Sequence, residues 1–357
     1  ALAAGVPVTH VSIHMTHTHS APLVDARAEQ LLAATSKPVK HLDLDWMARM
    51  TTEAARAVET GVHNLQPFTH IGLGQAKVEH FASTRRVKGP DGKIQVRYSA
   101  TKEPELRAQP EGRIDPWLKT VTFYDGDTAL VRLHYYASHP QSTYGDGKVH
   151  PDTPGLARSY LEGEEGVSQV YFTGCAGDVT AGKYNDGSPE RRQALSKELY
   201  SGMIRAIAAT QKEAVSSFSW KSIDVVLPPK EDPKFPPELL RRTLEDPEAP
   251  AEKRQAAAIR LAWAERVRRR PALDLGRLRI GSLDILHLPG EPFVEFQLYA
   301  QSVRPDRFVA VAGYGEGGPG YICTDEAHAE GGYEPTQSMV APPTESLLKS
   351  AIAELLK

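Results

Sequence analysis

The sequence predicts an α/β fold in which helices flank a mixed β-sheet. Strand-like and helix-like segments alternate along most of the 357 residues, as is typical of α/β proteins. Two pairs of neighbouring strand-like segments are joined by short turns, which indicates hairpins and therefore antiparallel neighbours in the sheet. Two predicted strands lead into histidines, so we expect a site at strand ends.

The first predicted strand, Val11–Ser20, has the sequence VSIHMTHTHS and ends in a His-x-His pair. Alternate side chains of a strand point to one face, and the apolar residues at 11, 13 and 15 share that face with His17 and His19. An apolar row that ends in two imidazoles is a common way to hold a transition metal. Two solvated or hydrogen-bonded histidines would give the same pattern.

A second histidine follows the better of the two hairpin signals. Residues 120–124 and 129–137 flank the turn Asp125-Gly126-Asp127, and the apolar residues of the second strand alternate. The next position of the same parity is His139, and Pro140 ends the strand. The polar stretch His139–Gly155 that follows could line a site. A histidine that simply faces water at the end of a strand is the alternative.

The remaining elements follow from periodicity, caps and turn residues. Helices are expected over Asp25–Thr35, Leu42–Val62 (capped by Asp43 or Asp45), Thr153–Leu161, Ser188–Gln211 and Ala341–Lys357. Strands are expected over Thr69–His80, Val167–Phe172, Ser219–Leu227, Leu278–Ile280, Leu283–Leu288 and Phe308–Ala312. Glu291 is expected at the head of a further amphipathic helix, where the helix dipole favours a carboxylate.

Residues 230–270 differ from the rest of the chain in composition. They are rich in Pro, Glu, Lys and Arg and carry helical patterns near Pro237–Glu245 and Ala249–Arg269. We interpret this stretch as a helical surface insertion in a single domain that spans residues 1–357. The arginines at its end are more typical of a solvated helix end than of a binding patch.

Composition excludes several classes of function. The net charge of −3, with 40% hydrophobic and 24% charged residues, is that of an ordinary globular protein, and no basic face indicates nucleic-acid binding. No apolar run approaches the ~20 residues that a transmembrane helix needs. The two cysteines, Cys175 and Cys323, allow either one disulfide or two free thiols.

Four stretches, taken together and in this order, resemble the neutral/alkaline non-lysosomal ceramidase family, zinc amidases that cleave N-acylsphingosines. They are Thr16–Pro22 (THTHSAP), Ala137–Gly155 (ASHPQS through HPDTPG), Gly174–Thr180 (GCAGDVT) and Leu288–Phe293 (LPGEPF). A fifth stretch, Tyr321–Glu334 (YICTDEAHAEGGYE), matches in the spacing of its two tyrosines and its final glutamate. The resemblance runs over most of the chain.

The resemblance implies a zinc site made by His17, His139, Glu291 and Tyr321. Two imidazoles and a carboxylate are a sound set of ligands for catalytic Zn²⁺ and leave room for water. Tyr321 is the unusual member, because a neutral phenol is a poor ligand, but a nearby Zn²⁺ favours the phenolate.

The resemblance also implies catalytic roles for four other residues. Zinc-bound water would attack the carbonyl carbon, and Arg85 and Tyr333 would stabilise the developing oxyanion. His19, which matches the family's second, non-ligand histidine, would transfer a proton to the departing nitrogen. Thr180 stands where the family has a serine, and its hydroxyl would orient water or substrate.

We therefore expect a zinc-dependent hydrolase of a linear N-acyl amide, with a small-molecule or lipid substrate that a membrane surface could supply. Two alternatives stay open: a zinc esterase or other small N-acyl hydrolase on the same scaffold, and a non-catalytic zinc-containing binding domain. The resemblance further implies an extracellular or periplasmic protein, and a bacterial relative without the N-terminal segment of the family.

Overall fold

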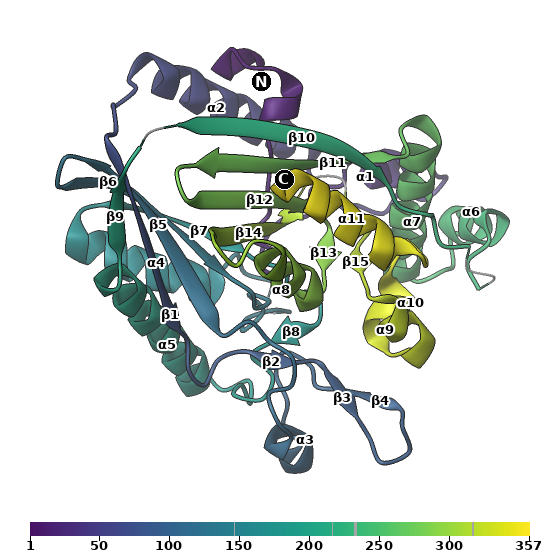
Figure 1. Cartoon of the computed structure of the whole chain (residues 1–357). Coiled ribbons are helices and arrows are strands. Elements are labelled where there is room, and N and C mark those ends of the chain that lie inside the picture. Colours follow the sequence, from purple (N-terminus) through teal and green to yellow (C-terminus); the bar gives the residue numbers. More distant parts are fainter. Residues whose placement is uncertain (146, 216, 232–233, 316–317) are drawn as a thin grey trace.

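Two β-sheets lie face to face at the centre of the fold, and helices cover their outer faces (Figure 1). The structure is a computed structural model and describes residues 1–145, 147–215, 217–231, 234–315 and 318–357. Residue 146, in the Ala137–Gly155 motif, and residues 232–233, in the expected insertion, lie outside the described residues.

The first sheet has five strands in the order β7-β6-β5-β1-β9, of which only β6 and β7 run parallel. Its strands are β1 (His70–Lys77), β5 (Trp117–Asp125), β6 (Thr128–Tyr136), β7 (Ser168–Thr173) and β9 (Gln211–Ala214). Helices α4 (Asp152–Glu165) and α5 (Pro189–Ala208) cover its outer face, where Leu161, Leu195 and Leu199 are buried with Leu118 of β5. The predicted hairpin of β5 and β6 is confirmed.

The second sheet has four strands in the order β10-β11-β12-β14, and β12 and β14 run parallel. Its strands are β10 (Phe218–Val226), β11 (Ala272–Ile280), β12 (Leu283–Pro289) and β14 (Phe308–Gly315). Helices α8 (Val294–Val303) and α11 (Thr344–Leu356) pack on its outer face. The predicted hairpin of β11 and β12 is also confirmed.

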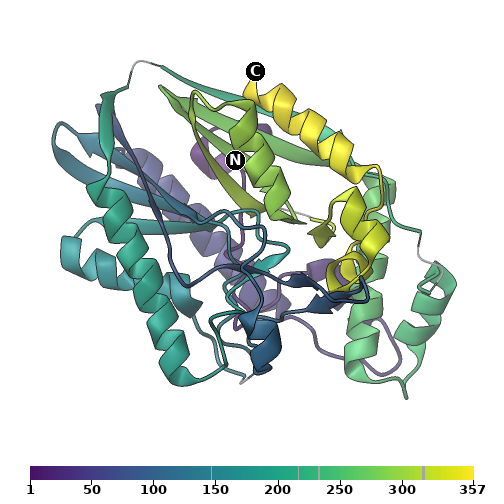
Figure 2. The ribbon, with the colours of Figure 1, turned by 60° about the horizontal axis from the view of Figure 1, so that its bottom comes forward.

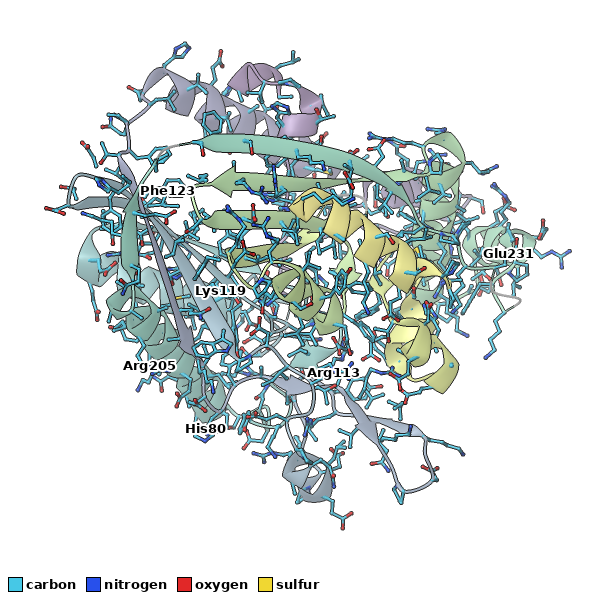
Figure 3. All side chains as sticks on the ribbon, viewed as in Figure 1. His80, Arg113, Lys119, Phe123, Arg205 and Glu231 are labelled. Atoms are coloured by element: carbon cyan, nitrogen blue, oxygen red, sulfur yellow. The ribbon has the colours of Figure 1, made fainter. Side chains whose placement is uncertain are left out.

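The inner faces of the two sheets share one apolar core. Ile71 and Val121 of the first sheet are buried with Ile285 and Ala310 of the second. Lys119 of β5 also reaches across, and its ammonium donates to the carbonyl oxygen of Val309 at 2.8 Å (Figure 3). The α/β class with mixed sheets and flanking helices is therefore confirmed, with the strands divided between two sheets.

Short elements connect the layers and carry four of the eight residues of the candidate site. They are η1 (Leu2–Ala4), η2 (Val8–His10), β2 (Ser83–Thr84), β3 (Arg86–Lys88), β4 (Ile94–Val96), α3 (Pro104–Ala108), β8 (Val179–Thr180), β13 (Glu291–Pro292), β15 (Tyr321–Ile322), α9 (Asp325–Glu330) and α10 (Tyr333–Gln337).

The predicted starts of three helices are confirmed, and in each of them a side chain caps the first turn. Asp25, Asp43 and Ser188 accept the main-chain N–H three residues later, at the starts of α1 (Ala26–Ala33), α2 (Leu44–His63) and α5. Although α2 is amphipathic, it has no buried residue.

The stretch from 230 to 270 contains two helices, as expected: α6 (Pro237–Glu245) and α7 (Ala251–Arg269). They pack with α1 around Leu32, Leu244 and Leu261 and lie at one edge of the molecule, away from the two sheets (Figure 2). Their assignment as an insertion in a single domain stays an interpretation.

The predicted strand at Val11–Ser20 is wrong. The segment forms only an isolated bridge, between His14 and Gly315, and Ile13 and Met15 of the expected apolar row are 54% and 43% exposed. The position of Glu291 is also corrected, because it lies in β13, whereas α8 begins at Val294.

Cys175 and Cys323 are buried free thiols, which settles the alternative left open by the sequence. Within the described ranges, we find no helix with the length and apolar character needed to cross a membrane.

Candidate metal centre

His139 follows β6, and the 174–180 turn after β7 fixes both its position and its proton. Its main-chain N–H donates to Val179 O at 2.9 Å, and its Nδ1 lies 2.6 Å from Ala176 O. Because a carbonyl oxygen can only accept, Nδ1 carries the proton, and Nε2 keeps a free lone pair. Burial also lowers the pKa of His139 to about 4, which favours the neutral ring.

His17 approaches His139 from the N-terminal segment. Met15 N donates to Tyr314 O at 3.1 Å, and Thr173 donates through its hydroxyl to Thr16 O at 2.8 Å. His17 itself has a φ of 64°, a left-handed conformation that costs an ordinary residue ~1–2 kcal/mol. Its ring stacks on Tyr314 with centroids 4.5 Å apart. Backbone strain at such a position is characteristic of functional sites.

His14 anchors the same segment to the second sheet. Its Nδ1 donates to Gly313 O at 2.7 Å, so its Nε2 accepts from Nδ1 of His287 at 2.9 Å. Burial lowers the pKa of both rings, that of His287 to about 3, which keeps both neutral. The His14–His287 contact therefore helps to hold the chain that carries His17.

Glu291 enters from β13, which pairs with β15, and its main-chain N–H donates to Gly320 O at 2.9 Å. Its Oε2 lies 3.3 Å from Nε2 of His17 and 3.4 Å from Nε2 of His139. Burial alone would raise the pKa of Glu291, but the two imidazoles outweigh burial and hold this pKa below its usual value.

These three atoms have the properties of metal ligands. His17 Nε2, His139 Nε2 and Glu291 Oε2 are all shielded from solvent, and none has a hydrogen-bond partner among the described residues. The lone pair of His139 faces a carboxylate oxygen, an unfavourable contact unless a cation or a proton lies between them. Two ligands bonded at ~2.0–2.1 Å in a tetrahedral shell stand about 3.3–3.4 Å apart, so the observed separations fit Zn²⁺.

His19 lies at the exposed side of this group. Its ring centroid is 4.8 Å from that of His17 and 5.8 Å from that of His139. One nitrogen from each of the three histidines lies within 4.8 Å of the others, so His19 is close enough to join a metal shell or to act beside it. Although its side chain is exposed, partial burial of the ring and the neighbouring histidines lower the pKa of His19 to about 3.

Arg85 connects the predicted ligand Tyr321 to a buried glutamate. Its Nη1 donates to the Tyr321 hydroxyl at 3.0 Å, and its Nε lies 3.3 Å from Glu334 Oε1. Tyr321 lies beside Glu291 in the β13–β15 pair, and its ring stacks on His139 with centroids 6.3 Å apart. Burial and the nearby Glu291 raise the pKa of Tyr321, so the phenol is neutral in this arrangement.

Tyr333 lies against Arg85, whereas Thr180 is buried in the short strand β8. The guanidinium carbon of Arg85 is 4.9 Å from the Tyr333 ring centroid, a cation–π distance. Thr180 is fully buried in β8, and its hydroxyl accepts from Gly182 N at 3.1 Å. The structure therefore links seven of the eight predicted residues in one chain of contacts, and leaves Thr180 in the neighbouring strand β8.

Sequence reasoning missed three residues that support the site. Tyr314 stacks on His17, Glu334 binds both Arg85 and Arg86, and His14 fixes the N-terminal segment. Glu334 was visible as the last residue of the Tyr321–Glu334 motif and His14 as a neighbour of His17. Nothing in the sequence around Tyr314 distinguishes it from a core tyrosine.

Comparison with known proteins gives structural matches only. No family model matches the chain, and no curated protein matches it. A crystal structure of neutral ceramidase from Pseudomonas aeruginosa matches with a TM-score of 0.63 and 17% identity, over 88% of this chain and 56% of that one. A ceramidase complexed with C2 matches with a TM-score of 0.69 and 17% identity, over 97% and 61%.

These matches establish the fold. The chain has the fold of bacterial neutral ceramidase, as the motifs led us to expect, and spans 56–61% of the length of those two chains.

Proposed function

We propose that this chain is a zinc-dependent hydrolase that cleaves a linear N-acyl amide, as ceramidases do. The observation that carries the proposal is the group of three buried, unpartnered atoms of His17, His139 and Glu291. These residues would hold the ion, with Tyr321 as a fourth ligand once its phenol is ionised. Zinc bound there would activate water for attack and polarise the scissile carbonyl.

The surrounding residues supply the other requirements of amide hydrolysis. Arg85 is held rigidly by Glu334 and Tyr321, and it offers further N–H donors to an oxygen that becomes negative. Tyr333 lies against Arg85 and would donate its hydroxyl to the same oxygen. The hydroxyl of Thr180, which accepts from Gly182 N, would orient water or substrate.

His19 is the best candidate for proton transfer. An amine leaves an amide only after its nitrogen is protonated, and a neutral imidazole beside the site can take a proton from water and deliver it. His19 is exposed toward solvent and lies beside both predicted histidine ligands. In this proposal a ring nitrogen of His19 carries the proton to the departing amine.

The substrate and the location of the protein belong to the same proposal. The fold supports a lipid or small-molecule N-acyl substrate, which a membrane surface could supply, and an extracellular or periplasmic protein, as its resemblance to ceramidases implies.

The first test is metal content combined with an activity assay. Protein purified without chelators should contain about one zinc per chain, the His139→Ala variant should lose it, and His63→Ala, in an exposed helix end, should keep it. The assay compares a long-chain N-acyl amide with the ester of the same acid. Absence of zinc from the wild type contradicts the metal site, cleavage of the ester alone supports an esterase, and a zinc-loaded protein without hydrolysis supports a binding domain.

A further inference from the structure

Tyr314 contacts both of the predicted histidine ligands. Its ring stacks on His17 with centroids 4.5 Å apart and an angle of 28° between the planes, and it meets the ring of His139 edge-on at 5.8 Å. Its hydroxyl lies 3.3 Å from Nδ1 of His139. Because that nitrogen carries a proton and donates it to Ala176 O, the hydroxyl oxygen is a second, weaker acceptor. One side chain therefore restrains both imidazole rings.

The backbone of Tyr314 is strained in the same way as that of His17. Its φ is 58°, a left-handed conformation that costs an ordinary residue ~1–2 kcal/mol. Within the described part of the chain, four residues other than glycine have a positive φ, and two of them are the partners of this stack. Such strain persists only where the surrounding structure imposes it, and it clusters at functional sites. Strain on both sides of one contact indicates that the site requires the contact.

Both main-chain groups of Tyr314 are hydrogen-bonded, which explains how the strain is maintained. Its N–H donates to Gly290 O at 2.7 Å, and its carbonyl oxygen accepts from the N–H of Met15 at 3.1 Å. The first bond joins Tyr314 to the residue before the predicted ligand Glu291. The second joins it to the segment that carries His17. Tyr314 is therefore tied to the two chain segments that bring these ligands together.

An irregularity in the second sheet accompanies this conformation. The pairing of β12 with β14 shifts between His287 and Pro289. Across the shift, Leu288 of β12 lies opposite two residues of β14, Gly313 and Tyr314. An extra residue of this kind is a β-bulge, which redirects a side chain and is frequent next to active sites. Here the redirected side chain is the one that contacts the two histidines.

We propose that Tyr314 is a positioning residue of the metal centre, which fixes the ring planes of His17 and His139 before a metal binds. The inference rests on the metal site of the proposed function but does not require hydrolysis. A metal bonds best along the lone pair of a ring nitrogen, so each ring must keep one orientation. His139 is also held by Ala176 O, whereas for His17 Tyr314 supplies the contact with the face of the ring.

The test is the zinc affinity of the full chain, measured by equilibrium dialysis against buffered zinc. Tyr314→Leu removes both contacts and should weaken zinc binding 10–100-fold, as the loss of groups that orient a ligand typically does. Tyr314→Phe keeps the stack and removes only the hydroxyl, so it should weaken binding about threefold, the effect of one weak hydrogen bond. The visible absorption bands of the Co²⁺-substituted protein, which depend on ligand geometry, should shift in Tyr314→Leu and lie close to those of the wild type in Tyr314→Phe.

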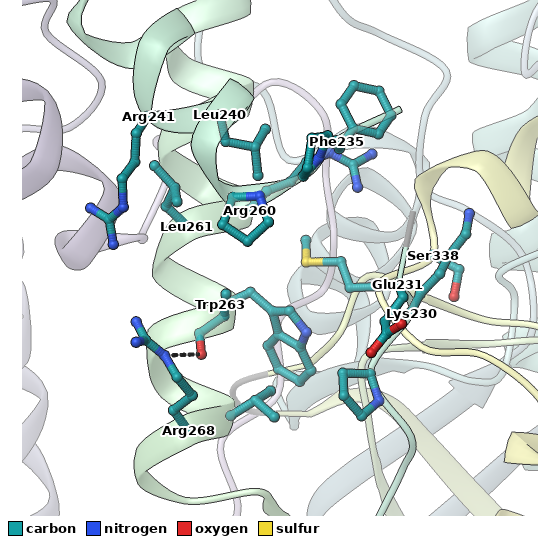
Figure 4. A pocket seen from close by; sticks show the side chains of 16 residues that line it. Lys230, Glu231, Phe235, Leu240, Arg241, Arg260, Leu261, Trp263, Arg268 and Ser338 are labelled. Atoms are coloured by element: carbon teal, nitrogen blue, oxygen red, sulfur yellow. Dashed lines mark hydrogen bonds between the residues drawn. The ribbon is translucent and has the colours of Figure 1, made fainter. Parts of the chain in front are cut away.

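Two controls separate positioning from structural support. Tyr171→Leu removes a buried tyrosine of β7, whose hydroxyl donates to Tyr136 O and not to a predicted ligand. Trp263→Leu removes an aromatic ring from the groove between α6 and α7, which none of the predicted ligands lines (Figure 4). Both variants should lower the midpoint of thermal unfolding and leave the zinc affinity and the Co²⁺ bands unchanged.

The outcomes distinguish this inference from the proposed hydrolysis. Zinc binding that depends on Tyr314, in a protein that cleaves no amide, supports the positioning role and contradicts the hydrolase. A wild type that binds no zinc contradicts both. An affinity that Tyr314→Leu leaves unchanged, or that Tyr171→Leu lowers equally, overturns the positioning role alone. If Tyr314→Leu does not fold, Tyr314→Phe decides: a threefold loss supports the role, and wild-type affinity overturns it.

Discussion

A Cβ atom added to Gly177 would lie 2.4 Å from the carbonyl oxygen of Glu291. Side-chain carbons do not approach a main-chain oxygen this closely, so only glycine lets the 174–180 turn lie directly against β13. The N–H of Gly177 uses this approach to donate to Pro292 O at 2.9 Å. The same turn supplies the carbonyl oxygen of Ala176 that fixes the tautomer of His139. One glycine thus sets the distance between two predicted zinc ligands.

We therefore expect Gly177→Ala to damage the metal centre. The added methyl group must push β13 away from the turn, at a cost of ~1–3 kcal/mol as in other overpacked sites. Thermal unfolding should show a lower midpoint, and elemental analysis should show less zinc than in the wild type. Gly163→Ala is the matched control: no heavy atom lies within 4 Å of its added Cβ, and alanine is the better helix former in α4. A Gly177→Ala protein with full zinc content would contradict this account.

The His14–His287 contact gives a second prediction. His14→Ala removes two hydrogen bonds that hold the N-terminal segment to the second sheet, and His17 follows three residues later. Loss of groups that orient a ligand typically weakens metal binding 10–100-fold, and we expect the zinc affinity to fall within that range. Competition with a chelator of known affinity measures it. His10→Ala, an exposed change in the same segment, should leave the affinity unchanged.

Much of the fold was predictable from the sequence because local signals decided it. Asp43 caps its helix as the sequence indicated, and Asp25 and Ser188 cap the helices that were expected to begin at those residues. The turn at 125–127 produced the expected hairpin. The division of the strands into two sheets was not predictable, since it depends on which apolar faces meet. Apolar and polar residues alternate along a strand in the same way whether the strands form one sheet or two.

The error at Val11–Ser20 has a specific physical cause. Alternation of apolar residues predicted a strand, but the segment is fixed instead by His14, by the N–H of Met15 and by the left-handed turn at His17. These contacts reach β14 and β12, far away in the sequence. The meeting of His17, His139 and Glu291 was expected only from the resemblance of their motifs, and their roles as ligands remain a prediction.

The buried Glu334 gives a third prediction, about stability. It is completely buried between Arg85 and Arg86, at 3.3 and 3.0 Å. Glu334→Gln removes the negative charge and leaves Arg85 without a buried counter-ion, which typically costs ~3–5 kcal/mol. Glu330→Gln is the control, because Glu330 binds Arg86 and the exposed Lys88 near the surface and should cost less than ~1 kcal/mol. Denaturant unfolding measures both, and equal losses would refute the role given to Glu334.

The buried His134 gives a fourth prediction, on the pH dependence of stability. Its Nε2 donates to Gln169 Oε1 at 2.8 Å and its Nδ1 accepts from the Thr120 hydroxyl at 2.9 Å, so the folded protein holds it neutral. Burial lowers the pKa of His134 to about 4, against 6.5 for a free histidine. The unfolded chain therefore binds a proton at a higher pH than the folded protein.

The sign of the effect follows from this difference. The contribution of His134 is fully present above about pH 6.5 and is lost as the pH falls toward 4, by up to about 3 kcal/mol. We expect the free energy of unfolding of His134→Gln to fall less steeply between pH 6.5 and 4 than that of the wild type, whereas His63→Gln should retain the wild-type slope. Denaturant unfolding at several pH values measures the slopes. If His134→Gln keeps the wild-type slope, the acid sensitivity of the protein originates elsewhere, because no other change was made to a buried titratable group.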